Sequence, residues 1–322
     1  MPPSFSILLE TENLAAVDES ALDQCLASLA EQDLPPSRAN EVLVLDSGEA
    51  PPAVLEGLRE RYPWVDVVPV GAESDYYDAK LRGAEAATGE VLVLCDSDCS
   101  YDPGWLAGLL SPFAESDGVE IVTGETTTEA SGPFGVAMAL AYLFPRPSGD
   151  RDMSRASSYD TNNVAIRREL LLSHPFPTRL PMYRGNHVIQ ARALLREGHA
   201  IWRQPEARAT HPVPEGASYF FWRFLLLGDE AFTIARFSRP SAGRAVRPFR
   251  DAILCAAIAG GRVKQLVLRA PSVFSEDRRR LALLPLAAPI AAAATVLYWT
   301  GLLLSYLRPG FLLRTFERAH AG

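Results

Sequence analysis

Residues 90–98 read EVLVLCDSD, a mostly apolar run that ends in two aspartates separated by one serine. An apolar run of this length is typical of a β-strand that is buried on both faces. Residues 79–88 before it have the pattern of a helix, and Gly89 is a residue favoured where a helix ends. The stretch therefore predicts a helix, a turn and a buried strand, with Asp96 and Asp98 at the end of that strand.

Strands and helices alternate in the same way before this stretch. Apolar runs predict strands at residues 4–10, 41–49 and 64–70, and helices at residues 21–29 and 54–61. Nearly all-apolar strands that alternate with helices indicate an α/β fold, with a mostly parallel, Rossmann-like sheet covered by helices on both faces. Ligands bind beyond the carboxyl ends of such strands. Asp46 and Asp96 both stand at these ends, so we expect them to belong to one binding site.

The sequence after residue 98 is less regular. It predicts a strand at residues 120–124, helices at residues 134–144, 164–172 and 188–197, and a long polar loop from residue 146 to 163. Long irregular loops in compact domains are often binding loops or lids. From about residue 216 the chain becomes aromatic and basic, so we expect the catalytic domain to comprise residues 1–215.

The overall composition limits the classes of partner. The 322 residues include 31 lysines and arginines and 39 acidic residues, which gives a net charge of −8 and a pI near 5.3. Such a protein is not expected to have nucleic acid as its main partner. The four cysteines form no CxxC pair, so we expect them to be buried apolar residues rather than zinc ligands.

Residues 281–307 contain no charged residue and exceed the roughly 20 residues that a helix needs to cross a bilayer. We expect this segment to associate with a membrane, as a span or as a re-entrant hairpin, because Pro285 and Pro289 weaken a simple helical span. A buried helix of a soluble domain is the alternative. If residues 281–307 associate with a membrane, residues 216–280 would form a basic, aromatic interfacial region and residues 308–322 a tail.

The N-terminus bears on the side of the membrane. Its first residues, MPPSFSILLETEN, lack the basic start and the long apolar core of a signal peptide. We therefore expect the catalytic domain to lie on the cytoplasmic face of the membrane, held there by the C-terminal segment.

The aspartate pair suggests a metal site. Two carboxylates at the end of a buried strand suit a hard divalent cation, and Mg²⁺ commonly binds one or two protein carboxylates together with substrate phosphates. Bound Mg²⁺ or Mn²⁺ would absorb the charge that develops on a departing diphosphate. Taken alone, the Asp96-Ser97-Asp98 triplet favours a strand-end turn whose aspartates are solvated.

Four stretches in the same order resemble landmarks of the family 2 glycosyltransferases, which have the GT-A fold. SFSILLETEN resembles that family's first strand and its Thr-x-Asn turn, and EVLVLDSGE resembles the second strand and its Asp-rich ending. DAKLRGAEAATGEVLVLCDSD resembles the helix, glycine turn and strand that lead to the DxD motif. YDTNNVAIRREL resembles the acceptor-side Asn-x-x-x-Arg segment. The resemblance covers residues 4 to about 212.

The resemblance implies a nucleotide-sugar donor of the UDP or GDP type and gives roles to several residues. Asp46 would contact the base or the ribose, Lys80 would lie near the diphosphate, and Thr11 would lie on the donor side of the first turn. Each residue also has a simpler interpretation. Asp46 could cap a turn, and Lys80 could be a solvated helix residue.

The resemblance also implies a metal shell. Asp96 would lie close to the sugar or ribose and share the metal with Asp98. PEARATHP, residues 205–212, resembles a strand that often ends in a histidine near the site, so His211 could complete the shell or be structural. Asn163, together with Asn162, could bind the sugar or order the loop.

The sequence departs from the family at the catalytic base. Inverting members usually carry a Glu-Asp pair at the start of a helix, but the matching residues here are Gly185 and Asn186. An amide does not take up a proton near neutral pH, so Asn186 is no base. His187 is the adjacent candidate, although it could simply face solvent at a helix start. Asp160 or Asp152 in the long loop could also serve.

We therefore expect a metal-dependent, inverting glycosyltransferase that uses an envelope or lipid-linked acceptor. The chain lacks the Gln-x-x-Arg-Trp motif of processive synthases, which favours a single transfer. The alternative from another class is a non-catalytic nucleotide-sugar-binding or scaffold protein that has lost the base. A nucleotidyltransferase is disfavoured because no Gly-rich phosphate loop follows the first strand.

Overall fold

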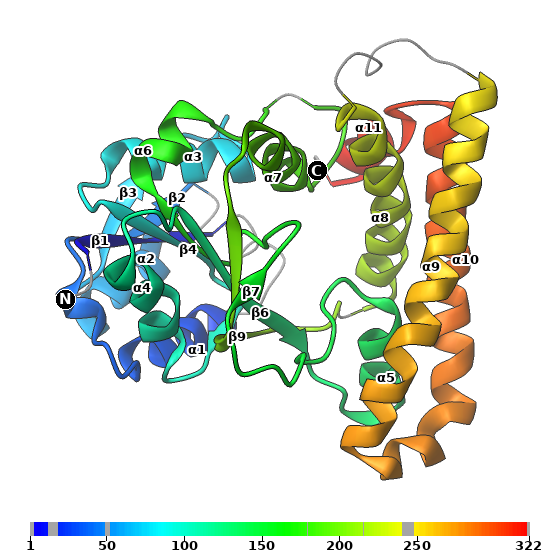
Figure 1. Cartoon of the computed structure of the whole chain (residues 1–322), viewed down its shortest axis with the longest axis horizontal. Coiled ribbons are helices and arrows are strands. Elements are labelled where there is room, and N and C mark those ends of the chain that lie inside the picture. Colours follow the sequence, from blue (N-terminus) through cyan, green and yellow to red (C-terminus); the bar gives the residue numbers. More distant parts are fainter. Residues whose placement is uncertain are drawn as a thin grey trace. The chain divides into compact units, whose positions relative to one another are not determined.

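Figure 1 shows the computed structural model of the chain, which describes residues 3–11, 19–48, 52–178, 180–214, 216–239 and 248–320. Contacts divide the chain into two compact units. The first unit comprises residues 1–126, 147–178 and 190–211, and the second comprises residues 127–146, 179–189 and 212–322. Two internal segments, residues 127–146 and 179–189, thus belong to the same unit as the C-terminal helices.

The described residues form one nine-stranded sheet in the order β3-β2-β1-β4-β8-β6-β9-β5, and β7 pairs with β9. The strands are β1 (Phe5–Glu10), β2 (Val42–Asp46), β3 (Asp66–Pro69), β4 (Val91–Asp96), β5 (Ser100–Tyr101), β6 (Ile121–Thr128), β7 (Ser154–Arg155), β8 (Asn163–Arg167) and β9 (Ile201–His211). Strands β3, β2, β1 and β4 are parallel, whereas β4 pairs antiparallel with β8 and β8 with β6. The parallel half brings the ends of β1 and β4 together, with Glu10 opposite Asp96.

Helices cover both faces of this sheet, as expected. They are α1 (Glu19–Ala30), α2 (Pro52–Arg61), α3 (Tyr76–Ala86), α4 (Trp105–Glu115), α6 (Arg168–Ser173) and α7 (Asn186–Glu197), with a short 3₁₀ turn η2 (Pro36–Arg38). Alternate residues of β1 point to opposite faces. Ile7 and Leu9 pack in the core beneath α1, α2 and α4, while Leu8 packs in the core beneath α3, α6 and α7. This two-sided burial explains why the strands are apolar at nearly every position.

The structure corrects two local expectations. Residues 164–172 are not one helix, because Asn163–Arg167 form β8, a central strand between β4 and β6, and only the residues after it are helical. Gly89 does not end α3, whose C-cap is Ala87. Gly89 is instead required by a close approach of two backbones, since a Cβ there would lie 2.4 Å from the carbonyl carbon of Phe5.

The second unit is helical apart from its share of β6. It contains α5 (Gly132–Ala141), α8 (Ala217–Phe237), α9 (Pro248–Glu276), the 3₁₀ helix η3 (Arg278–Leu283), α10 (Leu284–Leu307) and α11 (Phe311–His320), and it includes the first turn of α7. Helices α8, α9 and α10 run side by side (Figure 1). Small residues let α8 and α10 touch. A Cβ on Gly228 would lie 2.0 Å from the carbonyl oxygen of Tyr298, and one on Gly301 would lie 1.9 Å from that of Leu225.

Among the described helices, the segment Arg278–Leu307 is long and apolar enough to cross a membrane. Only 28% of its most apolar window is buried, and Leu286, Val296 and Leu303 are at least half exposed. The helix α10 continues without a break through Pro289, so the described chain forms no hairpin there. Pro285 lies in the first turn, where a missing N–H costs least, whereas Pro289 lies inside the helix and removes one backbone hydrogen bond.

Candidate functional site

The first aspartate of the DSD triplet lies in a buried network. Lys80 Nζ lies 2.7 Å from Asp96 Oδ1 and 3.1 Å from the carbonyl oxygen of Cys95, and the lysine side chain has no exposed surface. The hydroxyl of Tyr76 lies 2.8 Å from both carboxylate oxygens of Asp96 and 2.9 Å from Thr161 Oγ1. Burial, and next the charge of Asp96, raise the pKa of Tyr76 well above its usual value, so its hydroxyl stays protonated and donates.

This network contains two of the residues predicted to bind the donor, Lys80 and Asp96. Lys80 is not a solvated helix residue, because its buried ammonium group pairs with Asp96 at the end of β4. A buried ion pair is stable only when its geometry is good and its other hydrogen bonds are satisfied, and Tyr76 and Cys95 supply those bonds here. Asp96 is thereby oriented by the protein itself.

The second aspartate lies beside the predicted histidine. Asp98 Oδ2 lies 3.4 Å from His211 Nε2, and only 5% and 13% of the two side chains are exposed. Antiparallel pairing of β5 with β9 causes this meeting, since Ser100 is opposite Thr210 and only Cys99 separates the triplet from β5. The structure thus brings together two residues that are 113 positions apart in the sequence.

Asp98 and His211 have the donor chemistry for a divalent cation. Ligand atoms of Asp98, Cys99 and His211 lie within 4.8 Å of one another. Carboxylate and imidazole suit Mn²⁺, and carboxylate suits Mg²⁺. Burial, followed by the charge of Asp98, raises the pKa of the Cys99 thiol well above its usual value, so Cys99 stays a thiol and is a poor ligand for either ion. The donor set therefore fits a hard ion held by Asp98 and His211.

Asp160 belongs to the same electrostatic environment. Burial raises its pKa to about 6, the nearby His211 opposes that shift, and Asp96 adds to it. Among the carboxylates proposed from the sequence as a base, Asp152 is by contrast exposed. The structure thus brings Asp160 close to the residues that could bind a donor and a metal.

Gly185 and Asn186, which stand where inverting family members carry a Glu-Asp pair, have a backbone conformation that favours glycine at the first position. Gly185 has φ +105°, and a Cβ there would lie 2.6 Å from Ile234 Cδ1 within the second unit. A residue with a side chain is therefore strained at this position. Asn186 is buried, and His187 lies in the first turn of α7, also in the second unit.

The other predicted donor residues lie at strand ends or inside the core. Thr11 Oγ1 donates to the carbonyl oxygen of Leu45 at 2.7 Å, which joins the ends of β1 and β2. Asp46 Oδ1 accepts from the N–H of Gly48 at 2.9 Å, so it caps its own turn. Asn163 is completely buried. Its amide accepts from Trp105 Nε1 at 2.8 Å and donates to the carbonyl oxygen of Ala207 at 3.2 Å, so it joins β8 to α4 and β9.

Sequence reasoning missed several residues of the site. Tyr76 holds Asp96, and Tyr101 accepts from the N–H of Asp96 at 3.1 Å while donating to the carbonyl oxygen of Asn162 at 3.1 Å. Glu10 is buried at the position opposite Asp96. Of these residues, only Tyr76 could be placed from the local sequence, because it follows Asp75, an N-cap residue type whose side chain caps α3.

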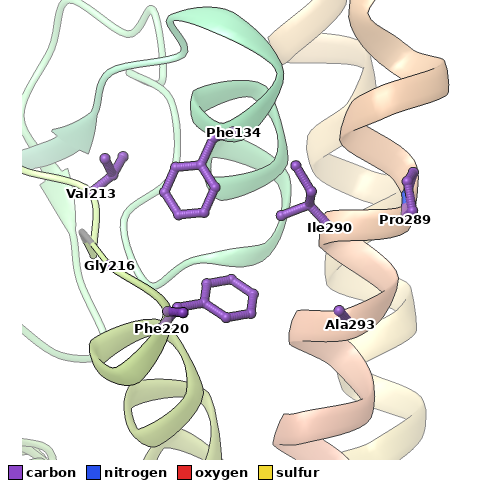
Figure 2. Close-up of a pocket in the computed structure, with 8 residues that line it drawn as sticks. Phe134, Val213, Gly216, Phe220, Pro289, Ile290 and Ala293 are labelled. Carbon is purple, nitrogen blue, oxygen red and sulfur yellow. The ribbon is translucent and has the colours of Figure 1, made fainter.

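An apolar pocket of about 760 Å³ lies within the second unit (Figure 2). The rings of Phe134 and Phe220, 5.9 Å apart, face Ile290 of α10. The lining contains no charged residue and consists of Phe134, Val213, Gly216, Ala217, Phe220, Pro289, Ile290 and Ala293. Such a surface suits a hydrocarbon ligand.

Two sequence comparisons find related proteins. The family described as glycosyl transferase family 2 matches residues 14–173. The glycosyltransferase AglE of Haloferax volcanii is 24% identical over 215 residues, which are 66% of this chain and 67% of AglE.

Solved structures show the same fold. The mannosyltransferase PcManGT from Pyrobaculum calidifontis, solved with GDP-Man and Mn²⁺, matches with a TM-score of 0.60 at 19% identity, over 96% of this chain and 88% of that one. GalNAc-T7, solved with UDP, GalNAc and Mn²⁺, matches with a TM-score of 0.54 at 16% identity. That match covers 66% of this chain and 44% of GalNAc-T7. The α/β fold of GT-A type expected from the sequence is thereby confirmed.

A double-mutant cycle tests the buried ion pair of Lys80 and Asp96. Lys80→Met leaves the Asp96 charge buried without its partner, so the free energy of unfolding should fall by about 3–5 kcal/mol. Adding Asp96→Asn removes that charge and should recover more than half of the loss. Urea unfolding followed by tryptophan fluorescence measures both effects.

Arg82→Met is the matched control, because Arg82 pairs with Glu73 at 3.0 Å on the surface. It should change stability by about 1 kcal/mol or less. Equal losses for Lys80→Met and Arg82→Met would contradict the assigned role of Lys80.

Proposed function

Because the chain belongs to glycosyl transferase family 2, we propose that it transfers a sugar from a nucleoside-diphosphate sugar to an acceptor hydroxyl with Mg²⁺ or Mn²⁺ bound. The observation that carries this proposal is the pair of Asp98 and His211 beside the oriented carboxylate of Asp96. Two structural relatives support the donor class, since PcManGT was solved with GDP-Man and GalNAc-T7 with UDP, each with Mn²⁺.

Asp98 and His211 would hold the cation. When bound there, a divalent ion supplies positive charge to the diphosphate that departs with the nucleoside. Asp96 is held by Lys80 and Tyr76, so its proposed role is to position the donor's ribose or sugar while Asp98 serves the metal. Asp46 and Thr11 remain proposed contacts for the nucleoside end of the donor, at the ends of β2 and β1.

We propose Asp160 as the base. Its carboxylate takes the proton of the acceptor hydroxyl as the acceptor oxygen bonds to the anomeric carbon, and the bond from that carbon to the diphosphate oxygen breaks. This direct displacement inverts the anomeric centre. Asp160 interacts electrostatically with both His211 and Asp96, which favours it over Asp152. His187, the neighbour of Asn186, is the second candidate.

The apolar pocket supports a lipid-linked acceptor. Its lining residues Val213 and Gly216 follow closely after His211 in the sequence, and Pro289, Ile290 and Ala293 come from α10. A hydrocarbon chain buried there gains about 0.8 kcal/mol per CH₂ group. A single hydrocarbon chain lying in this open pocket would anchor the acceptor while its polar end remains outside the apolar lining.

The exposed helix α10 supports membrane association. Its 24 residues span roughly 36 Å, which exceeds the bilayer's hydrocarbon thickness of about 30 Å. Its exposed apolar side chains would otherwise face water. The cytoplasmic face stays a prediction from the sequence.

Asp98→Asn should abolish metal-dependent release of nucleoside diphosphate. Purified protein is incubated with Mn²⁺ or Mg²⁺, a panel of UDP- and GDP-sugars, and soluble or lipid-linked acceptors, and the released nucleoside diphosphate is measured. The loss follows because the amide removes a negative ligand of the cation.

Asp102→Asn is its control, since Asp102 is exposed four residues away. The Asp102→Asn variant should still release nucleoside diphosphate. Absence of release from the unchanged protein with every donor and acceptor would instead support the alternative of a non-catalytic binding protein.

Asp160→Asn should lower sugar transfer by roughly 10²–10⁴-fold, the usual contribution of a general base, while nucleotide-sugar binding persists. Asp152→Asn, at an exposed position, should transfer at nearly the original rate. Transfer rates and donor Kd values separate the two effects. A loss in His187→Gln together with full activity in Asp160→Asn would assign the base to His187.

Val296→Asp should weaken binding to phospholipid vesicles by roughly 100-fold, because an aspartate at the centre of an apolar helix costs about 3 kcal/mol in the bilayer. Val296 is 56% exposed near the middle of α10, so the change should leave the helical core intact. Flotation with phosphatidylglycerol–phosphatidylethanolamine vesicles measures the bound fraction. The control is Val296→Ala, which should still bind, and equal flotation of both variants would refute membrane insertion of α10.

A further inference from the structure

Two histidines and two glutamates form a row in the first unit, separate from the Asp98 site. Glu197 Oε2 lies 3.2 Å from His174 Nε2, the rings of His174 and His199 are 5.3 Å apart, and His199 Nδ1 lies 2.8 Å from Glu120 Oε2. The ligand atoms of His174, Glu197 and His199 all lie within 4.8 Å of one another. The row shares no residue with the Asp98–His211 pair.

The backbone holds these side chains at the ends of two helices. His174 is the C-cap of α6 and Glu197 is the last residue of α7. Gly198 follows with φ +97°, and the N–H of His199 donates to the carbonyl oxygen of Leu194 at 3.0 Å. This glycine turn folds His199 back over the end of α7. The row therefore has a defined backbone support.

Both imidazoles are oriented as metal ligands usually are. A metal-binding histidine typically donates its second ring N–H to a carboxylate or another acceptor. Here His199 Nδ1 bonds to Glu120, and His174 Nδ1 lies 3.0 Å from Ser173 Oγ. These bonds engage both Nδ1 atoms, and His174 Nε2 faces Glu197.

The spacing is close to that of a tetrahedral ion. Bonds of roughly 2.0–2.1 Å to nitrogen and oxygen place neighbouring ligands about 3.3 Å apart. The 3.2 Å between His174 Nε2 and Glu197 Oε2 already matches this value. The side chains of His174 and Glu197 are 36% and 53% exposed, so rotations can close the remaining distances.

We propose that His174, Glu197 and His199 bind Zn²⁺, with Glu120 orienting His199. Imidazole and carboxylate are its ordinary ligands, and nitrogen donors favour zinc strongly over Mg²⁺. With neutral imidazoles, the two carboxylates carry two negative charges that one divalent ion neutralises. The bound ion joins the end of α6 to the end of α7.

The test uses the full chain carrying Asp98→Ala and His211→Ala, which removes the other candidate metal site. Metal-free protein of this background is titrated with Zn²⁺ by calorimetry and with Co²⁺ by visible absorption. One Zn²⁺ per chain, a tetrahedral Co²⁺ spectrum and a higher Tm with zinc are expected. Absence of zinc binding in this background overturns the proposal.

Ligand variants locate the ion. Adding His174→Ala or His199→Ala should weaken zinc binding by more than 100-fold, and adding Glu120→Gln should weaken it by about 10–100-fold. Glu169→Gln, at an exposed position of α6, is the matched control and should bind zinc unchanged. Circular dichroism without metal shows that each variant is folded, and Glu197→Gln provides a further ligand variant if one is not. Equal zinc affinity in the folded ligand variants and in Glu169→Gln overturns the proposal.

Discussion

A lysine with no exposed surface holds the first aspartate of the DSD triplet, and the candidate site is arranged around this pair. Taking two charges out of water is costly, so Lys80 and Asp96 persist only because Tyr76 and the Cys95 carbonyl complete their hydrogen bonds. The pair places a fixed carboxylate at the end of β4. The next aspartate, Asp98, then lies beyond the strand, where it meets His211.

That meeting depends on the antiparallel half of the sheet. The parallel strands deliver Glu10, Asp46 and Asp96 to one edge, as in other open α/β sheets. The long strand β9 then returns along β5 and ends at His211. A nitrogen ligand is thereby added to an edge that would otherwise offer carboxylates alone.

The sequence predicted the regular part of the fold well. Strands β1 to β4 and helices α1, α2 and α7 lie where the apolar patterns placed them, because each run is long enough to show its periodicity. Residues 164–167 were wrongly expected to be helical, since Val-Ala-Ile is too short a run to distinguish a strand from a buried helix. The identity of the family was also accessible, because its landmarks are local and ordered.

By itself, the sequence determined the α/β class, the family, the aspartate triplet and the long apolar helix, since all of these are local in the chain. Only the tertiary structure decided that Lys80 pairs with Asp96, that Asn163 is used in packing, and that His211 faces Asp98. It alone also joined α5 to the C-terminal helices. These facts depend on strand register and on contacts between distant segments, and a one-residue change in register turns a side chain to the opposite face of the sheet.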